Sequence, residues 1–190
     1  NEKHVDDARD FLLQSDFLQY GEDFFQSLVQ YLGKKLQASY VSVDLVTGNS
    51  MAETLAASHQ GMLSDTGTFS IQNTIILQTL GKPIFIKTER IREEYPEDSL
   101  LQELGAACYL GATIWNYNRV PAGVISVIWR DVPDNLHLAE SLLKMATVRI
   151  SGEIERTKAE NRLKDQDYRI REKLTALLEP EGDIGALTLA

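Results

Sequence analysis

One cysteine and three histidines are the side chains of this sequence best suited to nucleophilic or metal chemistry. A Cys108 thiolate with a neighbouring histidine as its base would be a nucleophile. Cys108 lies in an apolar segment, however, where a free cysteine usually packs as a small hydrophobic side chain. The histidines, which are His4, His59 and His137, lack the spacing of a metal site, and a metal ion needs several converging ligands. We therefore expect no catalytic residue and no metal, with Cys108 in the core and His59 on the surface.

The short motifs of common enzymes are also missing from the sequence, among them a glycine-rich phosphate loop, HExxH, CxxC and GxSxG. The formal net charge is −9, which disfavours nucleic acid, because nonspecific affinity for a phosphate backbone comes from Lys and Arg. A single cysteine excludes an intrachain disulfide, and no apolar run approaches the length of about 18 residues that spans a membrane. These features predict a cytoplasmic protein with no nucleic-acid partner and no direct membrane contact.

Helices and a strand pair are expected in the first third of the chain. Apolar residues recur at helical spacing over 5–17 and again from Tyr20 to Leu36, which predicts two amphipathic helices. Residues 39–46 alternate instead: Val41, Val43 and Leu45 point one way, and Tyr40, Ser42 and Asp44 point the other. A turn over 47–50 follows. Residues 51–58 have helical propensity, but their place after a hairpin turn favours a return strand.

Short elements are predicted for the middle of the chain. Their expected order is a loop over 61–67, an extended segment over 68–72, a helix over 74–80, a strand over 84–87, a charged loop over 88–95 and a brief helix after Ser99. Asn73 and Ser99 are the predicted N-caps of the two helices, and Gly81 and Gly105 are predicted to end them.

Two strands and one long helix are expected in the last part. Residues 107–115 and 122–129 predict an antiparallel hairpin, with Pro121 where the second strand begins. A helical stripe then follows through Ala139, Leu142, Leu143, Ala146, Ile150 and Ile154. The helix would run for ~40 residues, or ~60 Å, so its far half either finds another partner or stands in solvent as a charged single helix. Leu163, Ile170 and Leu177 recur every seven residues there, which indicates a coiled-coil seam.

Antiparallel neighbours and separate helices make the expected fold class α+β. The order of elements, together with GKPIFI, ELGAACYLGATIW and PAGVISVIWR, resembles the GAF domain family over 15–158. We accordingly divide the chain into an N-terminal helix over 1–14, a GAF-like sensory domain over 15–158, a coiled-coil-like signalling helix over 159–178, and a linker or truncated following domain over 179–190. The closing KLTALLEPEGDIGALTLA resembles the start of a PocR-type sensory domain.

The resemblance implies a pocket on one face of the sheet, beneath the short helices. The residues that its position selects are Phe69, Ser70, Asn73, Tyr95, Asp98 and Thr113. A closed core in which these residues cap helices and fill space is the alternative. The ligand is unknown: the cyclic-nucleotide signature Asn-Lys-Phe-Asp-Glu is missing, and no covalent bilin is expected, because Cys108 is followed by Tyr109 and the bilin cysteine would fall near Pro96.

The function that the resemblance implies is regulatory. A GAF-like domain would bind a small molecule as a homodimer and pass its ligand state to an output domain through terminal helices. The parent protein would be a sensor histidine kinase or a cyclic-dinucleotide synthase. Two alternatives stay open: a structural dimerisation module without a ligand, and a small enzyme like the GAF-type methionine sulfoxide reductase, whose chemistry needs several cysteines.

Overall fold

The computed structural model describes residues 22–178, and its elements are numbered from helix α2. The helices are α2 (Glu22–Lys35), α3 (Ile75–Thr79), α4 (Ile91–Glu94), α5 (Ser99–Leu104) and α6 (Leu136–Leu178). The strands are β1 (Tyr40–Gly48), β2 (Met51–His59), β3 (Met62–Ser64), β4 (Thr68–Ser70), β5 (Phe85–Lys87), β6 (Cys108–Trp115) and β7 (Pro121–Trp129). None of the described helices is long and apolar enough to span a membrane.

One antiparallel sheet organises the domain, with strand order β3-β2-β1-β7-β6-β5 and β4 paired to β2. The predicted hairpins β1–β2 and β6–β7 are confirmed, and so is the strand assigned to the segment after the first turn. Strands β1 and β7 join the two hairpins in the middle of the sheet, where Ser42 is opposite Ser126. The sheet and its helices confirm the α+β class.

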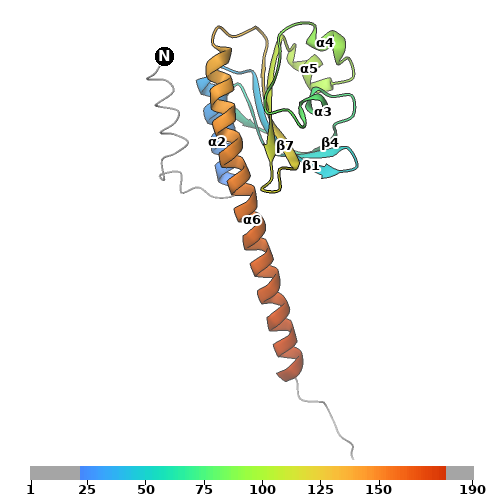
Figure 1. Cartoon of the computed structure of the whole chain (residues 1–190), viewed down its shortest axis with the longest axis vertical. Helices are drawn as coiled ribbons and strands as arrows, with labels where there is room; N and C mark the ends of the chain where they lie inside the picture. Colours follow the sequence, from blue (N-terminus) through green and yellow to red (C-terminus); the bar gives the residue numbers. More distant parts are fainter. Residues whose placement is uncertain (1–21, 179–190) are drawn as a thin grey trace, which may run out of the picture. The chain divides into compact units, whose positions relative to one another are not determined.

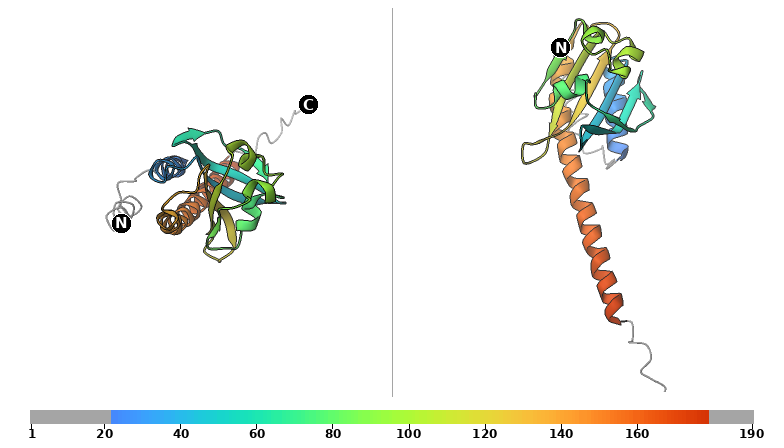
Figure 2. Two further views of the ribbon diagram at one scale, coloured as in Figure 1. Left: turned by 90° about the horizontal axis from the view of Figure 1, so that it is seen from above. Right: turned by 90° about the vertical axis from the view of Figure 1, so that its right-hand side faces the viewer.

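The alternation along β1 separates the two faces of the sheet. Val41 and Val43 are fully buried against α2 and the first part of α6, which lie side by side on one face (Figures 1 and 2). The predicted stripe on α6, from Ala139 to Ile154, is buried in this core and is confirmed. The indole of Trp129 adds a hydrogen bond of 3.0 Å to the Leu36 carbonyl, which fixes the end of α2 to the sheet.

Short helices α3, α4 and α5 occupy the opposite face (Figure 1). A smaller apolar cluster holds them there, including Ile75 from α3, Leu101 and Leu104 from α5, and Tyr109 and Ile128 from the sheet. This second face is only partly filled by apolar side chains, and it is where Tyr40, Ser42 and Asp44 point.

Two short elements replace segments predicted to be loops. Strand β3 lies within 61–67 and pairs with β2, because Gln60 and Gly61 take positive φ values and turn the chain back along the sheet edge. Helix α4 lies within 88–95, where an ion pair of 2.7 Å between Lys87 and Glu94 links its last turn to β5. The predicted helix over 5–17 lies outside the described residues.

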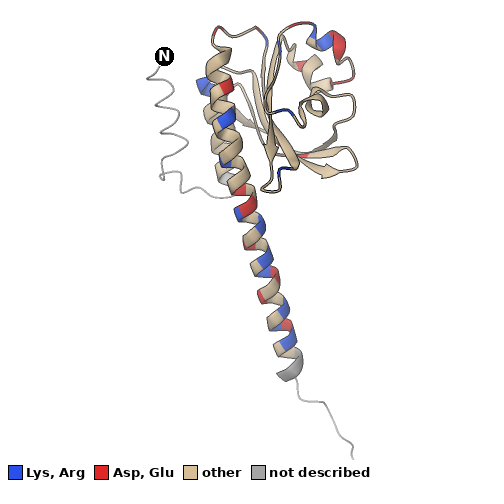
Figure 3. Cartoon of the chain, in the orientation of Figure 1, with Lys and Arg blue, Asp and Glu red and all other residues tan. Residues whose placement is uncertain are grey.

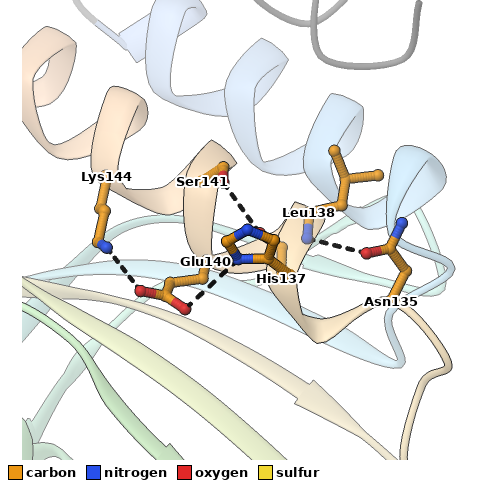
Figure 4. A network of polar contacts seen from close by, with 6 residues as sticks. All are labelled: Asn135, His137, Leu138, Glu140, Ser141 and Lys144. Atoms are coloured by element: carbon orange, nitrogen blue, oxygen red, sulfur yellow. Dashed lines mark hydrogen bonds and ion pairs between the residues drawn. The ribbon is translucent and has the colours of Figure 1, made fainter. Parts of the chain in front are cut away.

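Helix α6 begins with a side-chain cap. The side-chain oxygen Oδ1 of Asn135 accepts a hydrogen bond of 3.0 Å from the Leu138 backbone amide (Figure 4). One turn on, Glu140 pairs with Lys144, and this pairing lowers the pKa of Glu140. The Asn135 contact satisfies a backbone donor that a helix start otherwise leaves without a partner.

The chain divides into two compact units, one ending at Ile154 and one beginning at Glu155. In the second unit, the described part of α6 is densely charged with both signs (Figure 3). Leu163, Ile170 and Leu174 are exposed along it. Leu163 and Ile170 belong to the predicted seam.

Candidate functional site

A cavity of about 460 Å³, which we call the sheet pocket, lies between the sheet and the helices α3 and α5. Its floor consists of strand residues Tyr40, Ser42, Asp44, Thr54, Tyr109, Ser126 and Ile128. Its walls consist of Phe69, Ser70, Gln72, Thr74, Ile75, Ile76, Glu97, Asp98, Ser99, Leu100 and Leu101. The volume falls in the range of about 300 to 1,000 Å³ that is typical of small-molecule pockets.

A buried carboxylate lies at the floor of the sheet pocket. Asp44 is 2% exposed, and its two oxygens accept hydrogen bonds of 2.6 Å from the Ser42 hydroxyl and 2.7 Å from the Thr54 hydroxyl. Burial raises the pKa of Asp44 to about 6, although the two hydroxyl donors lower it. Asp44 makes no ion pair with any of the described residues. The carboxylate therefore stands as a desolvated charge with only neutral donors around it.

Tyr109 anchors a second polar group on the same floor. Its hydroxyl lies 2.9 Å from the Thr79 hydroxyl and 3.1 Å from the Ser126 hydroxyl. The ring fits because Gly111, two residues further on the same face, has no side chain: a Cβ there would overlap the Tyr109 hydroxyl and lie 2.8 Å from a Thr79 methyl carbon. Burial raises the pKa of Tyr109 far above its ordinary value, so the hydroxyl stays protonated.

Asp98 connects helices α3 and α5 in the wall of the pocket. One of its oxygens accepts from the Ile75 amide at 3.1 Å, and the other accepts from the Leu101 amide at 3.3 Å. It is thus the N-cap of α5 and also satisfies the first turn of α3. Burial raises the pKa of Asp98, against the lowering effect of these amide bonds.

The predicted caps Asn73 and Ser99 are therefore wrong. Asn73 takes a φ of 60° and donates its side-chain amide to Glu97 at 2.6 Å, and Ser99 is the first residue of α5 rather than its cap. The prediction that Gly105 ends α5 is confirmed, since it is the C-cap with φ 64°. Local sequence points to the nearest polar residue as a cap, whereas here a single aspartate serves both helices.

The six residues selected from the sequence fall in three places. Phe69, Ser70 and Asp98 line the sheet pocket. Asn73 and Tyr95 line a separate hollow of about 350 Å³ on the outer side of α3. Thr113 is buried beneath α3, where its hydroxyl donates to the Thr79 carbonyl at 2.9 Å, and it does not line the pocket.

Sequence reasoning missed the floor of the pocket. Asp44, Ser42, Thr54, Tyr109 and Ser126 come from four strands, and only the strand pairing brings them together. A signal was present in β1, because polar residues there occupy one face of a central strand whose other face is apolar.

The residues considered first for chemistry lie away from the sheet pocket. Cys108 is fully buried on the opposite face of the sheet, and burial raises the pKa of its thiol to about 11, which disfavours the thiolate. His59 is exposed at the end of β2, as predicted. Among the described residues, no group of three or more His, Cys, Asp or Glu side chains is placed to hold a metal ion.

A second hollow, of about 530 Å³, lies between the end of α2 and the start of α6. Its charged lining includes Arg130, Asp131 and Asp134, which are all exposed to solvent. Water already solvates these groups, so they gain little from a ligand. The sheet pocket, with its desolvated carboxylate, is the stronger candidate for a binding site.

Comparisons with known proteins bear on the fold. No protein-family model matches the sequence, and no curated protein matches it. Among solved structures, the crystal structure of the A. Aeolicus nlh2 GAF domain in an inactive state resembles this chain with a TM-score of 0.60 and 10% sequence identity. The similarity covers 81% of this chain and 94% of that one. The chain therefore has a GAF-like fold, as its order of elements predicted.

Proposed function

We propose that this chain is a regulatory domain that binds a small molecule in the sheet pocket and passes its ligand state on through α6. The observation that carries the proposal is the buried Asp44 carboxylate beneath an open cavity of about 460 Å³. Desolvating a charge costs free energy unless a partner compensates it. A ligand would supply that partner, whereas a purely structural core would have no use for it. The GAF-like fold supports the same reading.

The signalling part of the proposal depends on dimerisation. Leu163, Ile170 and Leu174 are spaced by seven and four residues on α6 and are all exposed. This is the spacing of a two-stranded coiled-coil seam, so we propose a homodimer through this helix. A ligand with different affinities for two arrangements of the sheet and helix would shift their populations.

A structural dimerisation module is the second candidate, and the same exposed seam favours it. It differs from the sensor only in its pocket, which would bind nothing. An enzyme of the methionine sulfoxide reductase kind is a poorer match, because the single cysteine is buried with a raised pKa. The histidine kinase or cyclic-dinucleotide synthase output stays a prediction. The PocR-type start over 179–190 lies outside the described residues.

The proposal is tested by thermal unfolding against a library of small metabolites. A ligand that binds only the native state stabilises it by RT ln(1 + [L]/Kd), or about 2.7 kcal/mol at a hundredfold excess over Kd. We expect at least one compound to raise the melting temperature of the wild-type chain. The same compound should leave a Ser126→Leu variant unchanged, because leucine at the floor would fill the pocket.

A folded Ser126→Leu variant that responds like the wild type would remove the sheet pocket from the proposal. Dimerisation is tested separately by sedimentation velocity. Ile170→Ser should shift the chain towards monomer, whereas Tyr168→Ser, which changes another exposed residue of α6 off the seam, should not. Equal behaviour of the two variants would contradict the helix seam.

A further inference from the structure

The charged side chains that line the sheet pocket are all acidic. They are Asp44, Glu97 and Asp98, and the described lining contains no Lys, Arg or His. Glu97 is exposed at the rim and accepts a hydrogen bond from Asn73. Asp98 is already engaged by two backbone amides. Asp44 therefore differs from Asp98 and Glu97, because no N–H group of the described residues donates a hydrogen bond to its carboxylate.

The hydroxyls around Asp44 have no proton left to offer a ligand. Ser42 and Thr54 each donate their only hydroxyl proton to the carboxylate. A hydroxyl has one proton and two lone pairs, so these oxygens can only accept further hydrogen bonds. This part of the floor presents acceptors alone.

The hydroxyl protons around Tyr109 are also all used in hydrogen bonds within the protein. Thr79 donates to the Ile75 carbonyl at 2.9 Å, and a carbonyl can only accept. Tyr109 must then donate to Thr79, and Ser126 must donate to Tyr109. The Ser126 hydroxyl proton is thus already used in a hydrogen bond within the protein. The lone pairs of the Ser126 oxygen add another acceptor to the floor.

Much of the remaining lining is apolar, beside the polar wall residues Ser70, Gln72, Thr74 and Ser99. Ile75 and Leu101 are 2% or less exposed in the walls, Ile128 is equally buried at the floor, and Phe69 and Leu100 are half-buried beside them. A ligand that fits would carry N–H donors at one end and an apolar body at the other. A metal ion fits this lining poorly, since it needs several converging ligands and no three His, Cys, Asp or Glu side chains of the described residues are placed to hold one.

We propose that the sheet pocket binds a small organic cation, whose protonated amine or amidine donates to Asp44 and whose apolar body packs on Ile75, Leu101 and Ile128. This inference rests on the proposed function and names the ligand class. The cation neutralises the buried charge and fills the acceptor sites of Ser42 and Ser126. An anion would face three carboxylates and no basic lining residue, so phosphate- or carboxylate-bearing ligands are rejected.

Three probes of similar shape test the ligand class on the wild-type chain: benzylammonium, benzyl alcohol and benzoate. Their binding is followed by amide chemical shifts of Ser42, Tyr109 and Ser126 in nitrogen-15 spectra. We expect benzylammonium to bind about ten- to a hundredfold more tightly than benzyl alcohol, because a hydrogen bond between charged groups is stronger than one from a neutral hydroxyl. Benzoate should leave these resonances in place.

Two variants that remove one negative charge each locate the interaction. Asp44→Asn should weaken benzylammonium binding by about ten- to a hundredfold. The matched variant Glu103→Gln, at an exposed residue of α5 that does not line the pocket, should change it by about twofold or less, because solvent screens that charge. Equal weakening in both variants would assign the effect to the general acidity of the surface and overturn the role of Asp44.

The outcomes separate this inference from the proposed function. Benzyl alcohol or benzoate binding at the floor as tightly as benzylammonium would overturn the cation preference and leave a small-molecule pocket standing. Unmoved floor resonances with all three probes, together with no stabilising metabolite in the library, would overturn both proposals. Because the comparison of probes uses the wild-type chain, it holds even where a variant fails to fold.

Discussion

Replacing Asp44 with asparagine removes a buried charge and keeps the size of the side chain. In the folded chain, burial raises the pKa of Asp44 from its ordinary value of 3.8 to about 6. The folded state therefore holds this proton more tightly than the unfolded state does. Between these two pKa values the folded state binds more protons, so the stability that Asp44 contributes falls as the pH rises through this window.

The size of the effect follows from the two pKa values. Each pKa unit corresponds to about 1.4 kcal/mol, so a rise from 3.8 to about 6 corresponds to about 3 kcal/mol. The full cost of the buried charge is present above about pH 6 and absent below about pH 4. Asparagine does not titrate. Asp44→Asn should accordingly gain about 3 kcal/mol relative to the wild type on going from about pH 4 to pH 7.

Urea unfolding at several pH values measures this difference, with the fluorescence of buried Trp129 as a reporter of the sheet. Tyr40 and Tyr109 next to the carboxyl stay neutral throughout, because burial raises the pKa of both. Asp98, whose pKa burial also raises, is present in both proteins, so its contribution cancels from the comparison. A stability difference between Asp44→Asn and the wild type that stays constant from acid to neutral pH would refute the reasoning.

Three further substitutions test other parts of the fold by urea unfolding. Gly111→Ala should cost about 1 to 3 kcal/mol, because its Cβ would overlap the Tyr109 hydroxyl, and a neutral effect would contradict that packing. Asp98→Ala should cost about 2 kcal/mol, since two helix starts lose their acceptor; a loss of a few tenths would mean that water replaces it. Gly105→Ala should cost about 1 kcal/mol at its φ of 64°, and an unchanged stability would argue against a left-handed C-cap.

The sequence predicts most of the sheet because the strand signals are local. Alternation in β1 and the apolar runs of β6 and β7 fall between clear turns, and the long helix continues without a breaker from Leu136. Short elements were harder to predict. The three residues of β3 owe their conformation to the neighbouring strand β2, and tertiary pairing of this kind leaves little trace in the segment itself.

The candidate site depended on contacts between distant segments. Phe69, Ser70 and Asp98 could be selected because the family resemblance places its pocket beneath the short helices. Asp44 could not, because its importance follows from its burial and from a partner on the neighbouring strand, Thr54. The hydrogen-bond directions of the Ser126 hydroxyl and its neighbours could not be predicted either, because they depend on the strand register. Polar residues on one face of a central strand are the signal that would have found them.

The most direct test of the account is to record nuclear Overhauser contacts between the protons of a bound ligand and the methyl groups of the isotope-labelled chain. Benzylammonium or a stabilising metabolite can serve as the ligand. The account predicts contacts to Ile75, Leu101 and Ile128 in the sheet pocket. Contacts confined to methyls of the opposite face, such as Leu142 or Leu143, would contradict it.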